Sequence, residues 1–363
     1  MSEQKPLVSV IMPVYNVENY IKRAVDSVTC TDFDDYEIIL TNDGSTDSSA
    51  SICDELSKNN PKIKVIHQEN AGVSMARNAA LSISRGKYIY FMDPDDYSVG
   101  ELLKDNILLA EKYNCDQVIF GFVNEVRDNR GRVVSHIDFY PGKEGLYSFD
   151  EFKKEYNYHI KNISNVVWNR IYSAKSIKGI TFRKELNTAE DAAFNMEVLL
   201  NSQTENIYYN NKIYYVYLRR ASSLMNDYNP DRFKNEMLIT DLMKEAADKW
   251  GMEKELRLAL AVRYACTMLN EYNNMIMPSC KLTTSEIIKK MKEFNADKRV
   301  ANSKKIIKPC HIPQLTARIC YVLVLLKLYR TAYYFRKFYT PFSVYIHKIL
   351  RRHRPKEIYS NTD

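Results

Sequence analysis

Residues 88–96 of the sequence, YIYFMDPDD, place an apolar segment directly before a group of carboxylates. Aromatic and aliphatic side chains fill residues 88–92, as is typical of a buried strand. Asp93, Asp95 and Asp96 follow at once. Like charges this close are costly without a cation, and carboxylate oxygens are ligands that Mg²⁺ and Mn²⁺ prefer. The motif alone leaves two interpretations open, a metal site or an ordinary acidic turn.

On both sides of this motif, strand and helix patterns alternate along the chain. Apolar runs predict strands at residues 7–12, 36–40, 64–67, 88–92 and 117–122. Helical spacing of apolar residues predicts helices at residues 17–28, 47–56 and 74–84, with Asp47 as a plausible N-cap. This order is typical of an α/β fold with a mostly parallel sheet and helices on both faces. Ligands of such sheets bind beyond the carboxyl ends of the strands, where residues 15–16, 42–43 and 93–96 are expected.

After residue 122, the patterns are mixed at first and become helical from residue 235 onward. Residues 124–145 are expected to form a hairpin or loop, followed by helices at residues 148–156, 166–172 and 190–200 and a strand pair at residues 207–209 and 213–218. From residue 235 onward strand patterns are not evident, and residues 237–270 predict two or more amphipathic helices. With 363 residues, the chain is expected to hold two domains, residues 1–234 and 235–363.

The charge of the chain is concentrated near its end. The net charge is +7, and the segment from Ala301 to Asp363 carries 13 Lys or Arg against only Glu357 and Asp363. Within it, residues 318–354 interleave aromatic and aliphatic residues with basic ones. This pattern suits an interfacial helix on anionic lipid, or a C-terminal helix that packs on its own domain, and both interpretations stay open. A merely solvated basic tail is a further alternative. No nucleic-acid partner is expected, because basic residues alone lack a recognisable binding signature.

The cysteines and the N-terminus predict an intracellular protein. Seven cysteines are scattered without a CxxC pair, so reduced thiols are expected. The first residues show no secretory signal, and the longest uncharged apolar stretch, residues 319–326, is far shorter than the roughly 20 residues of a spanning helix. Cytoplasmic residence follows as an expectation, with peripheral attachment to the inner face of the membrane through the basic tail.

Two other strand ends are candidates for contacts with a nucleotide base. Asp43 lies in the segment TNDGSTD, and its carboxylate can accept the imide N–H of a uracil ring. A turn followed by a helix cap explains the neighbouring residues of that segment but not Asp43 itself. Pro13, Val14 and Tyr15 either simply end a strand or put backbone groups and an aromatic ring beside the base.

Four motifs in order resemble the inverting family 2 glycosyltransferases with the GT-A (Rossmann-like) fold. They are VSVIMPVYNVENYIKRAVDSV, YEIILTNDGSTDSS, NAGVSMARNAAL and GKYIYFMDPDD. The resemblance covers residues 7–122 and continues more thinly to about residue 225. It implies a nucleotide site lined by Pro13, Val14, Tyr15, Asp43, Arg77, Asp93 and Pro94.

The resemblance also implies individual roles around a cation, Mn²⁺ or Mg²⁺. Asp93 and Asp95 would form the DxD motif, with Asp95 as the direct metal ligand and Asp93 on the ribose, the metal or a metal-bound water. The role of Asp96 is left open. Arg77 would approach the nucleotide or brace the carboxylates. Arg219 or Arg220 would help to hold the diphosphate.

The pair Glu190-Asp191 matches the family's ED motif, in which the aspartate deprotonates the acceptor hydroxyl. Asp191 is therefore the expected general base, with Glu190 on the side of the sugars. Acidic residues at a helix start also balance the helix dipole, which is the plainer explanation. Trp168 either lies near the acceptor or donor sugar or anchors the core, and the core is favoured slightly.

Together these expectations describe a metal-dependent, inverting transferase. It would move a sugar from a UDP-sugar to a glycan or lipid-linked oligosaccharide acceptor in cell-surface polysaccharide biosynthesis. The alternative is a non-catalytic, nucleotide-sugar-binding partner subunit of a glycosyltransferase complex. The helical C-terminal region is a candidate surface for a homo-oligomer. Neither the sugar nor the linkage can be predicted.

Overall fold

The computed structural model describes residues 5–128, 130–155, 166–201, 204–219 and 227–339. The chain forms two compact units, one of residues Met1–Ser223 and Asp241–Glu253, the other of residues Leu224–Thr240 and Lys254–Asp363. Helix α8 (Arg232–Lys249) supplies residues to both. The expected division into functional domains at residues 234 and 235 stays a prediction.

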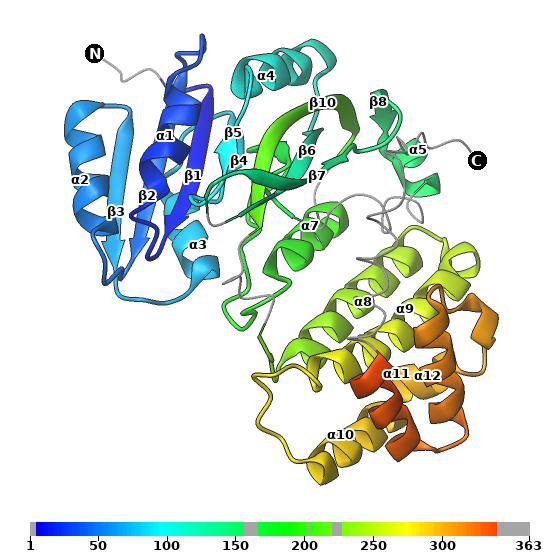
Figure 1. The fold of residues 1–363 in the computed structure, drawn as a ribbon. Coiled ribbons are helices and arrows are strands. Elements are labelled where there is room, and N and C mark those ends of the chain that lie inside the picture. Colours follow the sequence, from blue (N-terminus) through cyan, green and yellow to red (C-terminus); the bar gives the residue numbers. More distant parts are fainter. Residues whose placement is uncertain (1–4, 129, 156–165, 202–203, 220–226, 340–363) are drawn as a thin grey trace. The chain divides into compact units, whose positions relative to one another are not determined.

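The first unit is built on a mixed sheet with the strand order β3-β2-β1-β4-β9-β6-β10-β5 (Figure 1). The strands are β1 (Val8–Val14), β2 (Tyr36–Asp43), β3 (Ile63–Gln68), β4 (Tyr88–Phe91), β5 (Tyr97–Ser98), β6 (Gln117–Arg127), β7 (Val133–Phe139), β8 (Gly145–Ser148), β9 (Arg170–Ser173) and β10 (Asn206–Arg219). Strands β1 to β4 are parallel to one another, as are β6 and β10. Strand β9 lies between these two blocks and is antiparallel to both neighbours.

Helices cover both faces of this sheet, as the alternation of side chains along β1 shows. Val10 and Met12 belong to one buried cluster and Ile11 to another, because successive side chains of a strand point to opposite faces. The first cluster includes residues of α1 (Ile21–Thr29), α2 (Ser49–Asn59) and α4 (Leu102–Tyr113). The second includes residues of α3 (Val73–Ile83) and α7 (Glu190–Asn201). The predicted α/β class is confirmed.

Two local predictions are wrong, because strand pairing over long distances overrides local pattern. Residues 166–172, predicted as helix, instead lead into β9, which pairs with β4 and β6. The predicted strand pair at 207–218 is the single strand β10, with irregular register between Asn210 and Tyr215. Helix α4 was not predicted. The hairpin interpretation of residues 124–145 is confirmed, since β6 and β7 are antiparallel neighbours.

The second unit consists of helices, as the sequence predicts. Beside residues of α8 it contains α9 (Glu253–Asn274), α10 (Thr284–Ala296), α11 (Lys298–Ser303), the 3₁₀ helix η2 (Pro309–His311), α12 (Leu315–Leu325) and a helix over residues 329–339. Their shared core includes Met268, Tyr272 and Tyr321. A short helix, α5 (Phe149–Lys154), belongs to the first unit. None of the helices in the described ranges has the length and apolarity that crossing a bilayer requires.

Candidate active site

The carboxyl ends of β1, β2 and β4 lie at one edge of the sheet, because these strands are parallel and adjacent. Pro13 and Val14 end β1 with buried side chains, and Tyr15 follows with 49% of its surface exposed. Asp43 is the last residue of β2, and Asp93 comes shortly after β4. The predicted convergence of these strand ends is therefore present.

Asp43 holds the loop before α3 through neutral N–H donors. Its Oδ1 accepts hydrogen bonds from Gln68 Nε2 at 2.7 Å and from the Ala71 backbone N–H at 2.8 Å, while its Oδ2 accepts from the Gly72 N–H at 2.9 Å. The side chain is buried. A carboxylate offers about four acceptor positions, of which these bonds use three. Asp43 therefore has a structural role that sequence reasoning did not find.

Arg77, on α3, joins the two acidic motifs. Its Nη1 donates to Asp191 Oδ1 at 2.7 Å and to Glu190 Oε1 at 3.1 Å, and its Nη2 donates to Asp93 Oδ1 at 2.9 Å. The guanidinium also lies 5.1 Å from the centre of the Phe182 ring. Its side chain is only 3% exposed. Of the two roles open for Arg77, bracing the carboxylates is observed.

Three carboxylates around one guanidinium leave an excess of negative charge in a buried place. Burial raises the pKa of Asp191 to about 8, although the charge of Arg77 opposes the rise. Burial likewise raises the pKa of Asp93 against the effect of Arg77. For Arg77, burial lowers the pKa, but the three acids outweigh it and raise the pKa above its usual range. The cluster favours an added positive charge.

The carboxylates of Asp93, Asp95 and Asp96 form a compact group, with one oxygen of each lying within 4.8 Å of the others. Asp96 is engaged elsewhere: its Oδ2 accepts from the Tyr215 hydroxyl and its Oδ1 from the Leu218 N–H, both at 2.8 Å. Burial raises the pKa of Asp96 well above its ordinary value. Asp93 and Asp95 therefore fit a divalent cation by the hardness of their oxygens, and Asp96 anchors the motif to β10.

Asp191 lies in the first turn of α7 with its carboxylate held on both sides. Besides the Arg77 contact, its Oδ2 accepts from the Val167 backbone N–H at 3.2 Å. The two acids of the first turn also match the dipole of the helix. The catalytic role of Asp191 stays a prediction, but the structure brings this carboxylate and the acidic motif after β4 onto the same arginine.

Trp168 follows Val167 and is packed in aromatic side chains. Its ring stacks on Tyr215 with centroids 4.4 Å apart and on Tyr217 at 5.7 Å, and meets the edge of Phe122 at 4.7 Å. It is 5% exposed. The core interpretation of Trp168 describes its observed contacts, and a contact with a sugar stays a prediction.

Two predicted arginines and two residues that were not predicted remain to be placed. Arg219 ends β10 with an exposed side chain, and Arg220 lies outside the described residues. Sequence reasoning missed Tyr215 and Arg23, whose Nη2 donates to the Asp95 backbone carbonyl at 3.0 Å. An aromatic residue in a predicted strand and a basic residue in a predicted helix carry no local signal that points to such partners.

Known proteins share this sequence and fold. The model of glycosyl transferase family 2 matches residues 9–180. The uncharacterized glycosyltransferase EpsJ of Bacillus subtilis is 32% identical over 60% of this chain and 63% of EpsJ. The glycosyltransferase GlyA of Streptococcus pneumoniae is 34% identical over 60% of this chain and 31% of GlyA. The matches thus span less than two thirds of these relatives.

Solved structures show the same architecture. Residues 1–349 of TarS from Staphylococcus aureus align with a TM-score of 0.64 and 21% identity over 93% of this chain and 92% of that one. A second structure of that fragment, in complex with UDP-GlcNAc, aligns with a TM-score of 0.61 and 22% identity. The sheet order, the converging strand ends and these matches agree. Residues 9–180 thus resemble glycosyl transferase family 2, and the fold is the GT-A fold seen in the TarS fragment.

Proposed function

We propose that this protein transfers a sugar from a UDP-sugar to a hydroxyl group of a glycan or lipid-linked acceptor, with inversion at the anomeric carbon. The family match and the names of the relatives support sugar transfer, and a cell-surface polysaccharide as the product is part of the proposal. The TarS fragment of similar fold binds UDP-GlcNAc, which supports a UDP-sugar as donor. This support comes from other proteins, so the site must carry the argument.

The observation that carries the proposal is the position of Arg77 between Asp93 and the Glu190-Asp191 pair. One guanidinium contacts a carboxylate of the acidic motif after β4 and the carboxylate proposed as base. A donor held at the first and an acceptor held at the second would therefore be neighbours. Such proximity is what a single displacement needs.

Asp191 is the proposed general base. Arg77 and the Val167 N–H each hold one of its oxygens, which orients the carboxylate toward a fixed direction. A base whose pKa lies near the working pH transfers protons efficiently, and burial brings the pKa of Asp191 to about 8. The acceptor oxygen, once deprotonated, would attack opposite the departing diphosphate, and one such displacement inverts the anomeric centre.

Asp93 and Asp95 are the proposed ligands of Mn²⁺ or Mg²⁺. When bound, such a cation supplies positive charge that stabilises the departing diphosphate. The excess of negative charge around Arg77 favours its entry. Arg219, exposed at the end of β10, is proposed to add a second positive charge beside the diphosphate.

The uracil base is proposed to bind at Asp43. The acceptor position left on this carboxylate suits the imide N–H of uracil, whereas cytosine presents an acceptor nitrogen at the same place and guanine presents its N–H donors on a larger, two-ring base. Tyr15, half exposed beside it in sequence after β1, offers an aromatic ring. The Asp43 contacts therefore predict discrimination among nucleoside diphosphates.

Calorimetric titration with UDP, GDP and CDP in the presence of Mn²⁺ tests the donor and the metal together. We expect UDP to bind about tenfold more tightly than CDP, because one matched hydrogen bond in a buried site is worth about 1–3 kcal/mol, and more tightly than GDP, because guanine is a larger base. Asp95→Ala should abolish the dependence of UDP binding on Mn²⁺, whereas Glu55→Ala, an exposed acid on α2, should not. Equal affinity for the three nucleotides, or unchanged Mn²⁺ dependence in Asp95→Ala, contradicts the proposal.

A further inference from the structure

Exposed apolar side chains gather on the last two described helices and the turn between them. Leu315 is 65% exposed, Leu326 63% and Phe338 70%. Further members of this group, here called the C-terminal apolar surface, are Ile319, Leu325, Leu328, Tyr334 and Tyr339. Large apolar side chains concentrated in 25 consecutive residues mark a surface that meets something other than water.

The same helices are firmly packed on their other side. Cys320, Tyr321 and Val324 of α12 are buried in the core of the second unit, and so are Ala332 and Tyr333 of the helix at residues 329–339. In the described part of the segment, packing on its own domain therefore does not exclude contact with a lipid surface. One side of the segment docks on its own unit, and an apolar side remains exposed.

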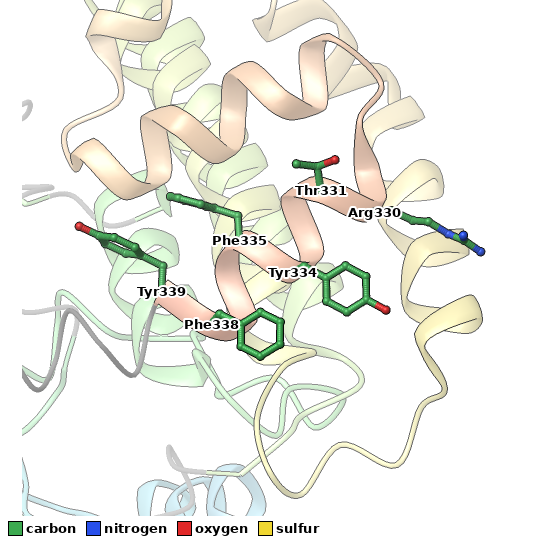
Figure 2. Close-up of a pocket in the computed structure, with 6 residues that line it drawn as sticks. All are labelled: Arg330, Thr331, Tyr334, Phe335, Phe338 and Tyr339. Atoms are coloured by element: carbon green, nitrogen blue, oxygen red, sulfur yellow. The ribbon is translucent and has the colours of Figure 1, made fainter.

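A groove lies on the exposed side of the helix at residues 329–339 (Figure 2). Its volume is about 680 Å³, and its lining residues are Arg330, Thr331, Tyr334, Phe335, Phe338 and Tyr339. Two aromatic pairs at i, i+4 spacing form its wall: Tyr334 stacks on Phe338 with centroids 6.1 Å apart, and Phe335 on Tyr339 at 5.3 Å. The groove is thus lined by rings, with one guanidinium at its edge.

The charged residues of the segment that carries this surface are all basic. Lys327, Arg330 and Lys337 have exposed side chains within it. The sequence has neither Asp nor Glu between Asp297 and Glu357, so acids along the chain do not balance these charges. A partner must therefore offer both an apolar phase and negative charge.

We propose that the C-terminal apolar surface binds the interface of an anionic phospholipid bilayer. Leucine and aromatic side chains would enter the boundary between headgroups and acyl chains, where aromatic rings are favoured, and the basic residues would meet lipid phosphates. A second copy of the chain fits less well. A two-fold contact would place the same positive charges against one another.

Flotation of the full-length protein with lipid vesicles tests this inference. We expect binding to vesicles with about 30% phosphatidylglycerol to exceed binding to pure phosphatidylcholine at least tenfold, and to weaken in high salt. Leu326→Glu combined with Phe338→Glu should lower the bound fraction at least tenfold, because two charges would have to enter the apolar layer. Leu108→Glu with Val134→Glu is the matched control, since both residues are 61% exposed in the first unit.

The charge contribution is tested separately by Lys327→Glu with Arg330→Glu, which leaves the apolar side chains in place. This variant should lose preference for anionic vesicles and is a second test if the first variant fails to fold. Unchanged flotation of either folded variant, or equal binding to neutral and anionic vesicles, overturns the proposal. The proposal is also overturned if the native protein does not bind vesicles and instead sediments as a dimer that Leu326→Glu dissociates. UDP binding should be unaffected by either variant, so failure here is distinct from failure of the proposed sugar transfer.

Discussion

Two groups of acids, one buried and one partly buried, lie at the same edge of the sheet, and they are held by different chemistry. Asp43 is surrounded by neutral N–H donors that tie down one loop. Asp93, Glu190 and Asp191 instead share Arg77, which joins elements more than 90 residues apart. The first arrangement stabilises a shape. The second stores an excess of charge that burial makes costly, as the raised pKa of Asp191 shows, and this imbalance is what chemistry can use.

The largest expected effect separates the two groups by activity. Asp191→Asn should reduce the rate of sugar transfer about 10² to 10⁴-fold, because it removes the proposed base while keeping the size of the side chain. UDP and Mn²⁺ affinities, measured by calorimetry, should change little. Transfer at a near-native rate by this variant would remove Asp191 from the base role.

The next effect concerns stability. Arg77→Gln should lower the free energy of unfolding by about 2–4 kcal/mol, because it leaves three partly buried carboxylates without their cation. Urea denaturation measures the change, and Arg77→Lys, which keeps one positive charge, should lose less. Mn²⁺ should stabilise Arg77→Gln more than it stabilises the native protein. Equal unfolding free energies of Arg77→Gln and Arg77→Lys would show that the positive charge at residue 77 does not contribute to stability.

The pH dependence sharpens the comparison within the native protein. Since burial raises the pKa of Asp191, this acid keeps its proton up to about pH 8 in the ligand-free state and is inactive as a base below it. The value of kcat/KM for the acceptor should therefore fall about tenfold per pH unit as the pH drops below that pKa. A profile that is flat from pH 5 to about 9 would contradict this assignment.

Asp43→Asn should have the smallest effect, because its partners are neutral. The amide can still accept some of these hydrogen bonds, but its NH₂ group faces backbone donors, so we expect a loss of about 1–3 kcal/mol in unfolding free energy. UDP affinity should fall in parallel, and transfer at saturating donor should be nearly retained. A drop in that saturated rate as large as for Asp191→Asn would place Asp43 in the chemistry.

Local pattern was enough to predict the parallel block of the sheet and the carboxylates at its ends. The apolar runs that became β1, β2 and β4 are short and rich in β-branched or aromatic residues, and these strands end at Val14, Asp43 and Phe91. Their adjacency follows from general topology, because a strand, helix, strand order produces parallel neighbours. The edge of the sheet that carries the site was therefore predictable.

The partners of those carboxylates were not predictable from one sequence. Arg77 meets Asp191 across 114 positions, and Tyr215 meets Asp96 across 119. Such contacts depend on which strands lie side by side, and β9 was predicted as helix because seven residues are too few to separate the two periodicities. In the second unit, helical spacing predicted helices over residues 237–270. Which apolar side chains of the unit stay exposed depends on how the helices pack.

The reversed direction of β9 has a consequence for which segments of the chain reach this edge of the sheet. The parallel strands β1 and β4 end at the edge of the sheet that carries the candidate site. Because β9 is antiparallel to β4, it begins at that edge, so Val167 and Trp168, which precede β9, lie near the end of β4. Residues ahead of β9 can change in length or composition without shifting the register of the strands that carry Asp43 and Asp93. The backbone that orients Asp191 therefore belongs to a different part of the chain from the strand ends that carry Asp43 and Asp93.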